Sequence, residues 1–394
     1  MKKLTSGRIR MALLSTLLIL GACGDTSSDG SENSVTVGVD AGGDVSTDTG
    51  SQCGEPTGER PPQLSEHAGA FVSADDGSAG TVVIFGGSLG IPENCDFPER
   101  TYETTTWAYD VDCDSWSKLD SAATPPGRTR HTAIYDAAEN RVIVYGGLGA
   151  NGPLDDTWAL DMDSGEWSEI ETSGGPAPAR LNHAAVYDPA GRMLVFGGNQ
   201  GSSVVDIDPS NDVWELDLST HTWTEVTPTQ AGPEPRLWSS ALWDDDQSQL
   251  VVYGGGDDSA FTGDVEYFDD AWAWRDDGDE PEWEELGAES TDRPAGRFWA
   301  GWSYDPVNQR YVLFAGHDAG NVDGKTLGNR NDTWSLDPAT GEWTEHFEGD
   351  VWNKPANGFC DFPADFTIID PESPERRNAH VFVSGPTGAY MMGG

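Results

Sequence analysis

Arginine is the residue type with the clearest potential for binding chemistry in this chain, because bases are scarce and five arginines recur in register. Only 22 lysines and arginines stand against 68 aspartates and glutamates, which gives a formal net charge of −46. The five recurring arginines are Arg128, Arg180, Arg236, Arg297 and Arg377. A guanidinium group can hold a carboxylate or sulfate through two parallel hydrogen bonds. The five therefore form a candidate binding site for an acidic or sulfated sugar, if the fold gathers them at one level.

Two tryptophans beside these arginines extend the candidate site. Trp238 and Trp299 each follow one of the arginines by two residues. Earlier segments hold Arg130 and Asn182 at the same place. An exposed indole beside a guanidinium group would stack well on a sugar ring, because its face is large and apolar. Packing between structural units is the other role, and it is the commoner one for tryptophan in such folds.

The sequence offers little support for a metal or catalytic centre. A D-x-D-x-D run spans Asp110–Asp114, but a calcium-binding EF-hand loop would need Gly at its sixth position and Glu at its twelfth. Ser115 and Ser121 stand there, so the run is typical of a turn between strands. Of the seven histidines, only His317 is left free for a loop site. We therefore predict no catalytic residue, no metal site and no cofactor.

The beginning of the chain has the pattern of a targeting signal. Four basic residues precede an apolar stretch at 11–20, which is too short to span a bilayer. The stretch runs into Leu20-Gly21-Ala22-Cys23, which resembles a bacterial lipobox. The resemblance implies cleavage before Cys23, lipidation of that residue and anchoring to a membrane of the bacterial cell envelope, facing the periplasm or the cell surface. An ordinary secretory signal with an incidental cysteine is the alternative.

Short strands are the elements that must position the candidate residues. Residues 128–170 read as four strands, because β-branched and aromatic runs alternate with turn residues. The second strand ends in Gly146-Gly147, and the third and fourth contain Trp158 and Trp167. No apolar pattern with the roughly 3.6-residue period of a helix occurs in this segment.

The same unit recurs along the chain. Paired glycines stand at 86–87, 146–147, 197–198, 254–255 and 393–394, and Ala315-Gly316 takes their place in the fifth unit. Each of the first five units also has a third-strand and a fourth-strand tryptophan, namely Trp107 and Trp116, Trp158 and Trp167, Trp214 and Trp223, Trp272 and Trp283, and Trp334 and Trp343. This spacing indicates a repeat protein whose sheets stack around an axis.

These repeated residues resemble the kelch β-propeller family, which also includes the central domain of galactose oxidase. The shared pattern is an Arg-x-x-His opening, an apolar strand ending in Gly-Gly, and acidic residues before the third-strand tryptophan. The resemblance implies an all-β fold of four-stranded antiparallel blades, five complete and a sixth partial. It also implies that the repeated arginine mostly braces neighbouring blades. Because the last unit lacks a third and fourth strand, we expect a C-terminally incomplete propeller.

The predicted organisation has three parts: a signal peptide at 1–22, a disordered Gly-, Ser- and Asp-rich tether at 23–62, and the propeller at 63–394. Outside the cytoplasm, four cysteines remain for disulfides. Cys95 and Cys360 share the sequence Cys-Asp-Phe-Pro and would lie on one face of neighbouring blades in a six-blade ring. We expect them to join across the seam of the ring, which leaves Cys53 for Cys113, although four cysteines permit three pairings.

A binding module is the function that the sequence favours. Propellers present the loops of many blades on one face and need no catalytic residues, so we expect a monomer that binds a protein or glycan in the cell envelope. The acidic surface would repel nucleic acid, which is not an expected partner. A carbohydrate-active enzyme is the alternative, because galactose oxidase and sialate epimerases are built on kelch-like propellers.

Overall fold

The computed structural model describes residues 53, 59–74, 78–89, 100–175, 177–203, 206–257, 266–276, 280–318, 328–349, 351–352, 367–368, 379–385 and 388–393. The regular elements in these ranges are strands. None of the described residues belongs to a helix of the length and apolarity that a membrane crossing requires.

Five antiparallel sheets contribute four consecutive strands each and form the blades. Blade one consists of β2 (Ala68–Val72), β3 (Thr81–Phe85), β5 (Thr106–Asp110) and β6 (Ser115–Leu119). Blade two consists of β8 (Thr132–Asp136), β9 (Arg141–Tyr145), β12 (Thr157–Asp161) and β13 (Trp167–Glu169). Blade three consists of β15 (Ala184–Asp188), β16 (Arg192–Asn199), β17 (Pro209–Asp217) and β18 (Thr222–Glu225).

The remaining blades follow the same order. Blade four consists of β19 (Ser240–Asp244), β20 (Gln249–Tyr253), β21 (Ala271–Arg275) and β22 (Glu282–Leu286). Blade five consists of β24 (Gly301–Asp305), β25 (Arg310–Asp318), β26 (Gly328–Leu336) and β27 (Trp343–Phe347). A sixth sheet contains β30 (Val381–Gly385) and β31 (Gly388–Met392). The predicted propeller, with five four-stranded blades and a partial sixth, is confirmed.

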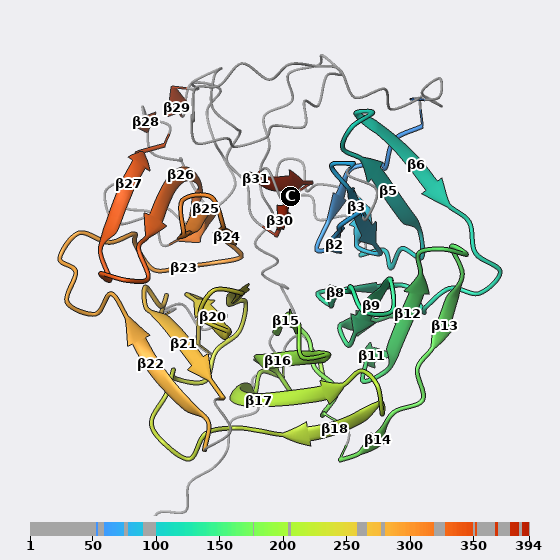
Figure 1. Ribbon diagram of the computed structural model, residues 1–394, viewed down its shortest axis with the longest axis horizontal. Helices are drawn as coiled ribbons and strands as arrows, with labels where there is room; N and C mark the ends of the chain where they lie inside the picture. Colours follow the sequence, from blue (N-terminus) through green and yellow to red (C-terminus); the bar gives the residue numbers. More distant parts are fainter. Residues whose placement is uncertain are drawn as a thin grey trace, which may run out of the picture.

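The first strands of the blades surround a central axis (Figure 1). In order, β2, β8, β15, β19, β24 and β30 each contact the next, and β30 returns to β2. The fourth strands β6, β13, β18, β22 and β27 lie at the periphery. Each blade is therefore sandwiched between two neighbours.

The apolar runs of the second strands follow from this stacking. In β9, Val142 and Val144 pack into a core cluster shared with blade one, whereas Ile143 and Tyr145 pack into a cluster shared with blade three. Alternate side chains point to opposite faces of a strand, so a strand buried on both faces must be apolar throughout.

The glycines that end these strands are required by backbone conformation and by the close approach of the next blade. Gly146 has a φ of +64°, and a Cβ there would lie 2.9 Å from the carbonyl oxygen of Arg180 in the next blade.

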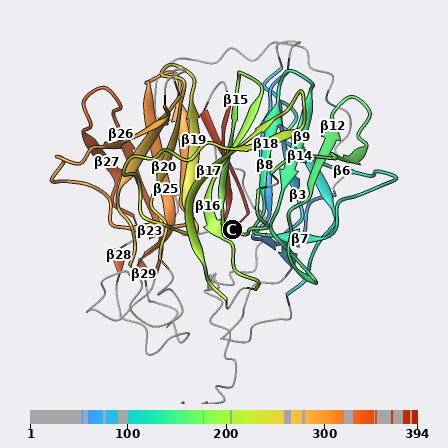
Figure 2. The same ribbon diagram turned by 90° about the horizontal axis from the view of Figure 1, so that it is seen from below.

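Short strands join the opening of each unit to the residues that follow its glycine pair. They include β1 (Leu64–Ser65) with β4 (Ser88–Leu89), and β7 (Arg128–Thr129) with β10 (Leu148–Gly149), which also pairs with β11 (Gly152–Pro153). In blade five, β23 (Arg297–Phe298) pairs with the end of β25. Figure 2 shows β7 and β23 toward the same end of the molecule. This end therefore carries Arg128 and Arg297, which begin these two strands.

Three further short strands complete the described structure. β14 (Ser173–Gly174) runs parallel to β18 at the edge of blade three. β28 (Val351–Trp352) pairs with β29 (Thr367–Ile368) between blades five and six in the sequence.

Candidate functional site

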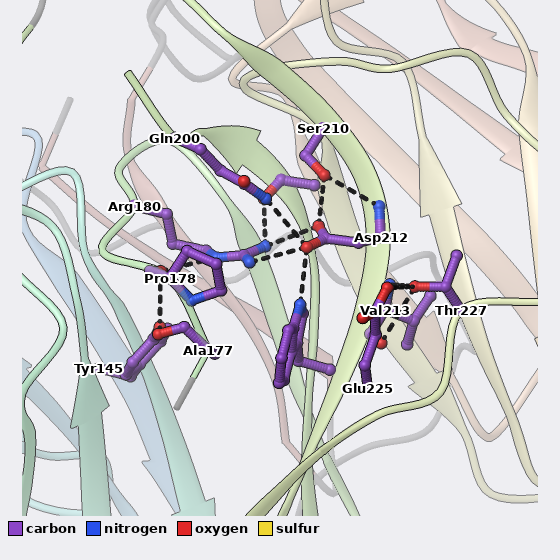
Figure 3. Close-up of polar contacts among 12 residues, drawn as sticks. Tyr145, Ala177, Pro178, Arg180, Gln200, Ser210, Asp212, Val213, Glu225 and Thr227 are labelled. Carbon is purple, nitrogen blue, oxygen red and sulfur yellow. Dashed lines mark hydrogen bonds and ion pairs between the residues drawn. The ribbon is translucent and has the colours of Figure 1, made fainter. Parts of the chain in front are cut away.

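Four of the five recurring arginines are buried and paired with aspartates inside their own blades. In blade three, Arg180 Nη1 and Nη2 donate to the two carboxylate oxygens of Asp212 at 2.8 and 2.9 Å, and Arg180 is fully buried (Figure 3). Arg180 Nε donates to the carbonyl oxygen of Pro178, and Nη1 donates to that of Gly197. Burial alone would raise the pKa of the Asp212 carboxyl, but hydrogen bonds and charge from Arg180 outweigh it and hold that pKa below its usual range.

The same arrangement recurs in three other blades. The equivalent pairs are Arg128–Asp156, Arg236–Asp270 and Arg297–Asp332, with nitrogen–oxygen distances of 2.7, 2.5 and 2.6 Å. In each of the four blades, the same carboxylate also accepts a hydrogen bond from the third-strand indole of Trp158, Trp214, Trp272 or Trp334. The arginine, the aspartate and the tryptophan of the repeat thus form one brace that ties the opening of the blade to its third strand.

This geometry corrects the view of these arginines as an open binding ring. Arg128, Arg180, Arg236 and Arg297 are at most 2% exposed, and their guanidinium groups already donate to acceptors of the protein. Desolvating such a group is unfavourable unless its donors are paired, and the nearby aspartates provide the pairing. Bracing is therefore the role that the contacts support. Arg377 lies outside the described residues.

Blade one lacks both charged residues of the brace. Leu64 stands where the other blades have arginine, and Thr105 stands where they have the aspartate. The indole nitrogen of Trp107 and the hydroxyl of Thr105 are buried without a hydrogen-bond partner in the described structure. Loss of the arginine thus coincides with loss of its counter-ion, which avoids leaving one charge buried alone.

Two residues after the brace position in the sequence, each of the six units has a residue with the same backbone conformation, and together these residues form a ring. Glu66, Arg130, Asn182, Trp238, Trp299 and Ala379, here called the axial ring, have φ values of 57°, 58°, 58°, 59°, 54° and 49°. Backbone N–H groups link consecutive members from Arg130 to Trp299, each donating to the carbonyl oxygen of the member before it at 2.9 to 3.1 Å. Because every member precedes a first strand, the ring surrounds the axis at the end that carries β7 and β23 (Figure 2).

The axial ring combines a fixed backbone with variable side chains. Left-handed φ values are costly for bulky residues and are ordinarily filled by Gly or Asn. Here the bulky Trp238, Trp299 and Arg130 occupy them. Backbone strain of this kind is concentrated at functional sites, where the surrounding structure holds it in place. The ring is therefore the candidate functional site.

One sector of the ring is charged. Glu66 Oε1 accepts hydrogen bonds from Arg130 Nε and Nη2 at 2.9 and 2.7 Å, and from Arg100 Nη2 at 3.3 Å. The three side chains are between 5% and 12% exposed. Burial would raise the pKa of the Glu66 carboxyl, but the two guanidinium groups hold it below its usual range. Burial and the neighbouring Arg130 lower the pKa of Arg100. This sector therefore concentrates two positive charges around one carboxylate.

The opposite sector is aromatic. The rings of Trp238 and Phe298 lie 4.9 Å apart, and the ring of Trp299 lies 5.5 Å from that of Trp238. Tyr267 and His317 both stack on Phe298, with ring centroids at 5.2 and 4.9 Å. The two sectors meet where the guanidinium of Arg130 lies 5.9 Å from the centroid of the Trp299 ring.

The two tryptophans were predicted from the sequence, but part of their surroundings differs from the prediction. Trp299 is half-buried, whereas Trp238 is only 3% exposed, so the packing role fits Trp238 and the hypothesis of an exposed indole for sugar stacking does not. His317 is not a free loop residue: it is 6% exposed and lies on β25. Tyr267 and Glu66 were not singled out, because no repeat of their residue type marks them. The sequence signal that could have found Glu66 is its place directly before His67, which matches the place of Arg130 before its own histidine.

The structure joins Cys53 to Cys113 by a disulfide with a Cα–Cα distance of 5.5 Å. The bond attaches the segment before β1 to the turn between β5 and β6. Cys23, Cys95 and Cys360 lie outside the described residues. No three His, Cys, Asp or Glu side chains of the described part are grouped so that they could hold a metal ion.

Comparison with known proteins agrees with this architecture. The profile of the KLHDC2/KLHL20/DRC7 kelch-repeats domain matches residues 16–203, 77–276 and 208–351. Among curated proteins, the chain is 34% identical over 229 residues to putative adagio-like protein 2 and 34% identical over 208 residues to adagio-like protein 1, both from rice. It is 30% identical over 152 residues to acyl-CoA-binding domain-containing protein 5 of Arabidopsis thaliana.

These matches extend over only part of each protein. They cover 57%, 51% and 39% of this chain, and 33%, 30% and 22% of the respective relatives. The family profile matches the chain from residue 16 to residue 351. With the repeated blades and braces described above, the chain belongs to the kelch-repeat family, whose repeats serve as protein-interaction modules.

Proposed function

We propose that this propeller binds a segment of a partner protein at the axial ring, and that it does so outside the cytoplasm, held to a membrane through Cys23. Membership of the kelch-repeat family supports the interaction role. The lipobox-like sequence before Cys23 supports the location.

The axial ring is the observation that carries the binding site. Its six members share one backbone conformation, but they present a carboxylate, a guanidinium group, an amide, two indoles and a methyl group. Positions that serve only to close the propeller have no physical need for such different side chains. The braces two residues earlier show the contrast, because their residue types repeat in four blades.

The two sectors favour a segment that carries both charge and apolar surface. Arg100 and Arg130 surround a single carboxylate, so the charged sector can attract an acidic group even though the chain as a whole has a net charge of −46. The aromatic sector supplies tryptophan side chains and the charged sector supplies arginine, and these residue types dominate the binding energy of many protein interfaces. A partner segment crossing the axis would contact both sectors.

Selection of peptides from a displayed random library on the purified full-length chain tests the site. Selected peptides should bind the Arg130→Ala and Trp299→Ala variants at least about tenfold more weakly, the loss expected of an interface hot spot. Lys118→Ala, an exposed change on β6, is the control and should bind like the unaltered chain. Full binding to both ring variants would refute the site, and binding to an array of glycans in place of peptides would refute the partner class.

A separate experiment tests the location. Metabolic labelling with a fatty acid in a bacterial host should label the unaltered chain and leave Cys23→Ala unlabelled and released from the membrane fraction. An unlabelled product with an N-terminus other than residue 23 would contradict the anchor without affecting the binding site.

A further inference from the structure

The aromatic sector holds two buried polar atoms that the structure leaves without partners. The hydroxyl of Tyr267 and Nε2 of His317 are both buried and have no hydrogen-bond partner in the described structure. Both rings stack on Phe298, and their centroids are 6.4 Å apart. An unsatisfied buried polar group is unfavourable and requires an explanation, such as a bound group or a water molecule.

The chemistry of the two atoms is complementary. His317 Nδ1 lies 2.9 Å from Asn329 Oδ1, and with this orientation of the amide Nδ1 is the donor. Burial lowers the pKa of the imidazole, so the ring is neutral at physiological pH and Nε2 is an acceptor. The Tyr267 hydroxyl can donate or accept. One hydroxyl group that donates to Nε2 and accepts from Tyr267 would satisfy both atoms.

The surroundings restrict what can carry that hydroxyl. The neighbouring surfaces are the rings of Trp238, Phe298 and Trp299, and Trp299 keeps part of its indole exposed. A hexose has several hydroxyl groups, and most of them would lose water here without finding a partner, because the described surfaces of this sector are mostly aromatic rings. A phenol has one hydroxyl on an apolar ring, and aromatic pairs gain stability from stacked or edge-to-face contacts. A phenol therefore matches this composition better than a sugar does.

We propose that the aromatic sector recognises a tyrosine side chain of the partner segment, with its hydroxyl between Tyr267 and His317 and its ring against the tryptophans. This inference rests on the proposed binding of a protein segment at the axial ring. It adds the residue type that the site selects.

Two small probes that differ by one hydroxyl test the proposal. N-acetyl-tyrosinamide and N-acetyl-phenylalaninamide are titrated against the full-length chain and followed by tryptophan fluorescence and saturation-transfer NMR. The tyrosine probe should bind at least about tenfold more tightly, because the phenylalanine probe leaves both buried atoms unpaired. Equal affinities, absence of saturable binding, or binding of methyl glucoside in place of the tyrosine probe would overturn the proposal.

Variants then assign the preference to the two atoms. His317→Phe keeps an aromatic ring but removes the acceptor, and it should bring the two affinities within about twofold of each other. His346→Phe, on the peripheral strand β27, is the matched control and should keep the full preference. A preference for the tyrosine probe that survives His317→Phe would overturn the assignment of the hydroxyl to His317. If that variant does not fold, the comparison of the two probes on the unaltered chain decides whether the sector recognises tyrosine. Selected peptides without tyrosine would refute this inference alone, whereas failure to select any peptide would refute the proposed function.

Discussion

The braces and the axial ring lie two residues apart in every complete blade except the first, yet they follow opposite rules. The brace position repeats its residue type and its partner, as in Arg180 with Asp212 and Arg297 with Asp332. The axial ring repeats its backbone angle but carries five different residue types in six blades. Neighbouring positions of one repeat can therefore be divided between scaffold and recognition. The residue type is constant in the brace, whose contacts lie within one blade, and it varies in the axial ring.

Blade one lacks the charged pair and is therefore a natural control for the brace. It closes with Leu64 and Thr105 in place of the charged pair, and its strands still pair in the regular antiparallel order. A blade can therefore form without a brace, provided that both charges are missing. The brace contributes to stability only as a matched pair.

Removal of one partner of a brace should have the largest effect. Arg297→Leu leaves the carboxylate of Asp332 buried and unpaired, which should lower the free energy of unfolding by about 3–5 kcal/mol. The double variant Arg297→Leu/Asp332→Thr reproduces blade one and should recover much of that loss. Chemical denaturation of the three proteins measures both effects. A double variant as unstable as the single one would show that the two residues do not act as a pair.

Acid should produce a loss of similar size for each histidine that directly follows a member of the axial ring. Burial lowers the pKa of His67 to about 4 and that of His183 to about 3, from an ordinary value of 6.5. The unfolded chain therefore binds protons at a higher pH than the folded chain does. Below pH 6.5 each histidine should reduce stability by about 1.4 kcal/mol per pH unit, until the pH reaches the pKa of the folded protein.

Blade four supplies the control for this pH dependence, because it carries Ser239 at the equivalent place. His183→Ser should make the loss of stability between pH 6.5 and 4 less steep, as followed by thermal unfolding across that range. An unchanged slope would show that His183 does not contribute to acid sensitivity.

A change in the axial ring should have the smallest effect on stability. Trp299→Asn removes a half-buried indole but places a residue that tolerates the left-handed region at a φ of 54°. The lost packing and the relieved strain should nearly cancel, so that the free energy of unfolding changes by about 1 kcal/mol or less. Peptide binding should nevertheless fall. A loss of stability as large as that of Arg297→Leu would show that Trp299 has a structural role. The brace and the axial ring would then not differ in function.

Much of the fold could be predicted from local pattern, whereas the site could be predicted only in part. Glycine pairs and tryptophans mark strand ends and blade interfaces, because strand geometry and close backbone approach allow few residue types there. Trp238 and Trp299 were found because they interrupt the repeat. Glu66, Arg100 and Tyr267 were not, because a single carboxylate, guanidinium or phenol carries no repeat signal.

The sequence by itself determined the number and order of the blades, the residues between them and the acidic character of the chain. Only the tertiary structure decided that four of the recurring arginines form ion pairs with aspartates 28 to 35 residues away. It also decided that Arg130 donates to Glu66, which lies 64 residues away in the chain. Strand periodicity and turn chemistry act over a few residues and are visible in the sequence. Closure of the ring depends on how all six sheets tilt around one axis, and this closure places the charged and aromatic sectors face to face.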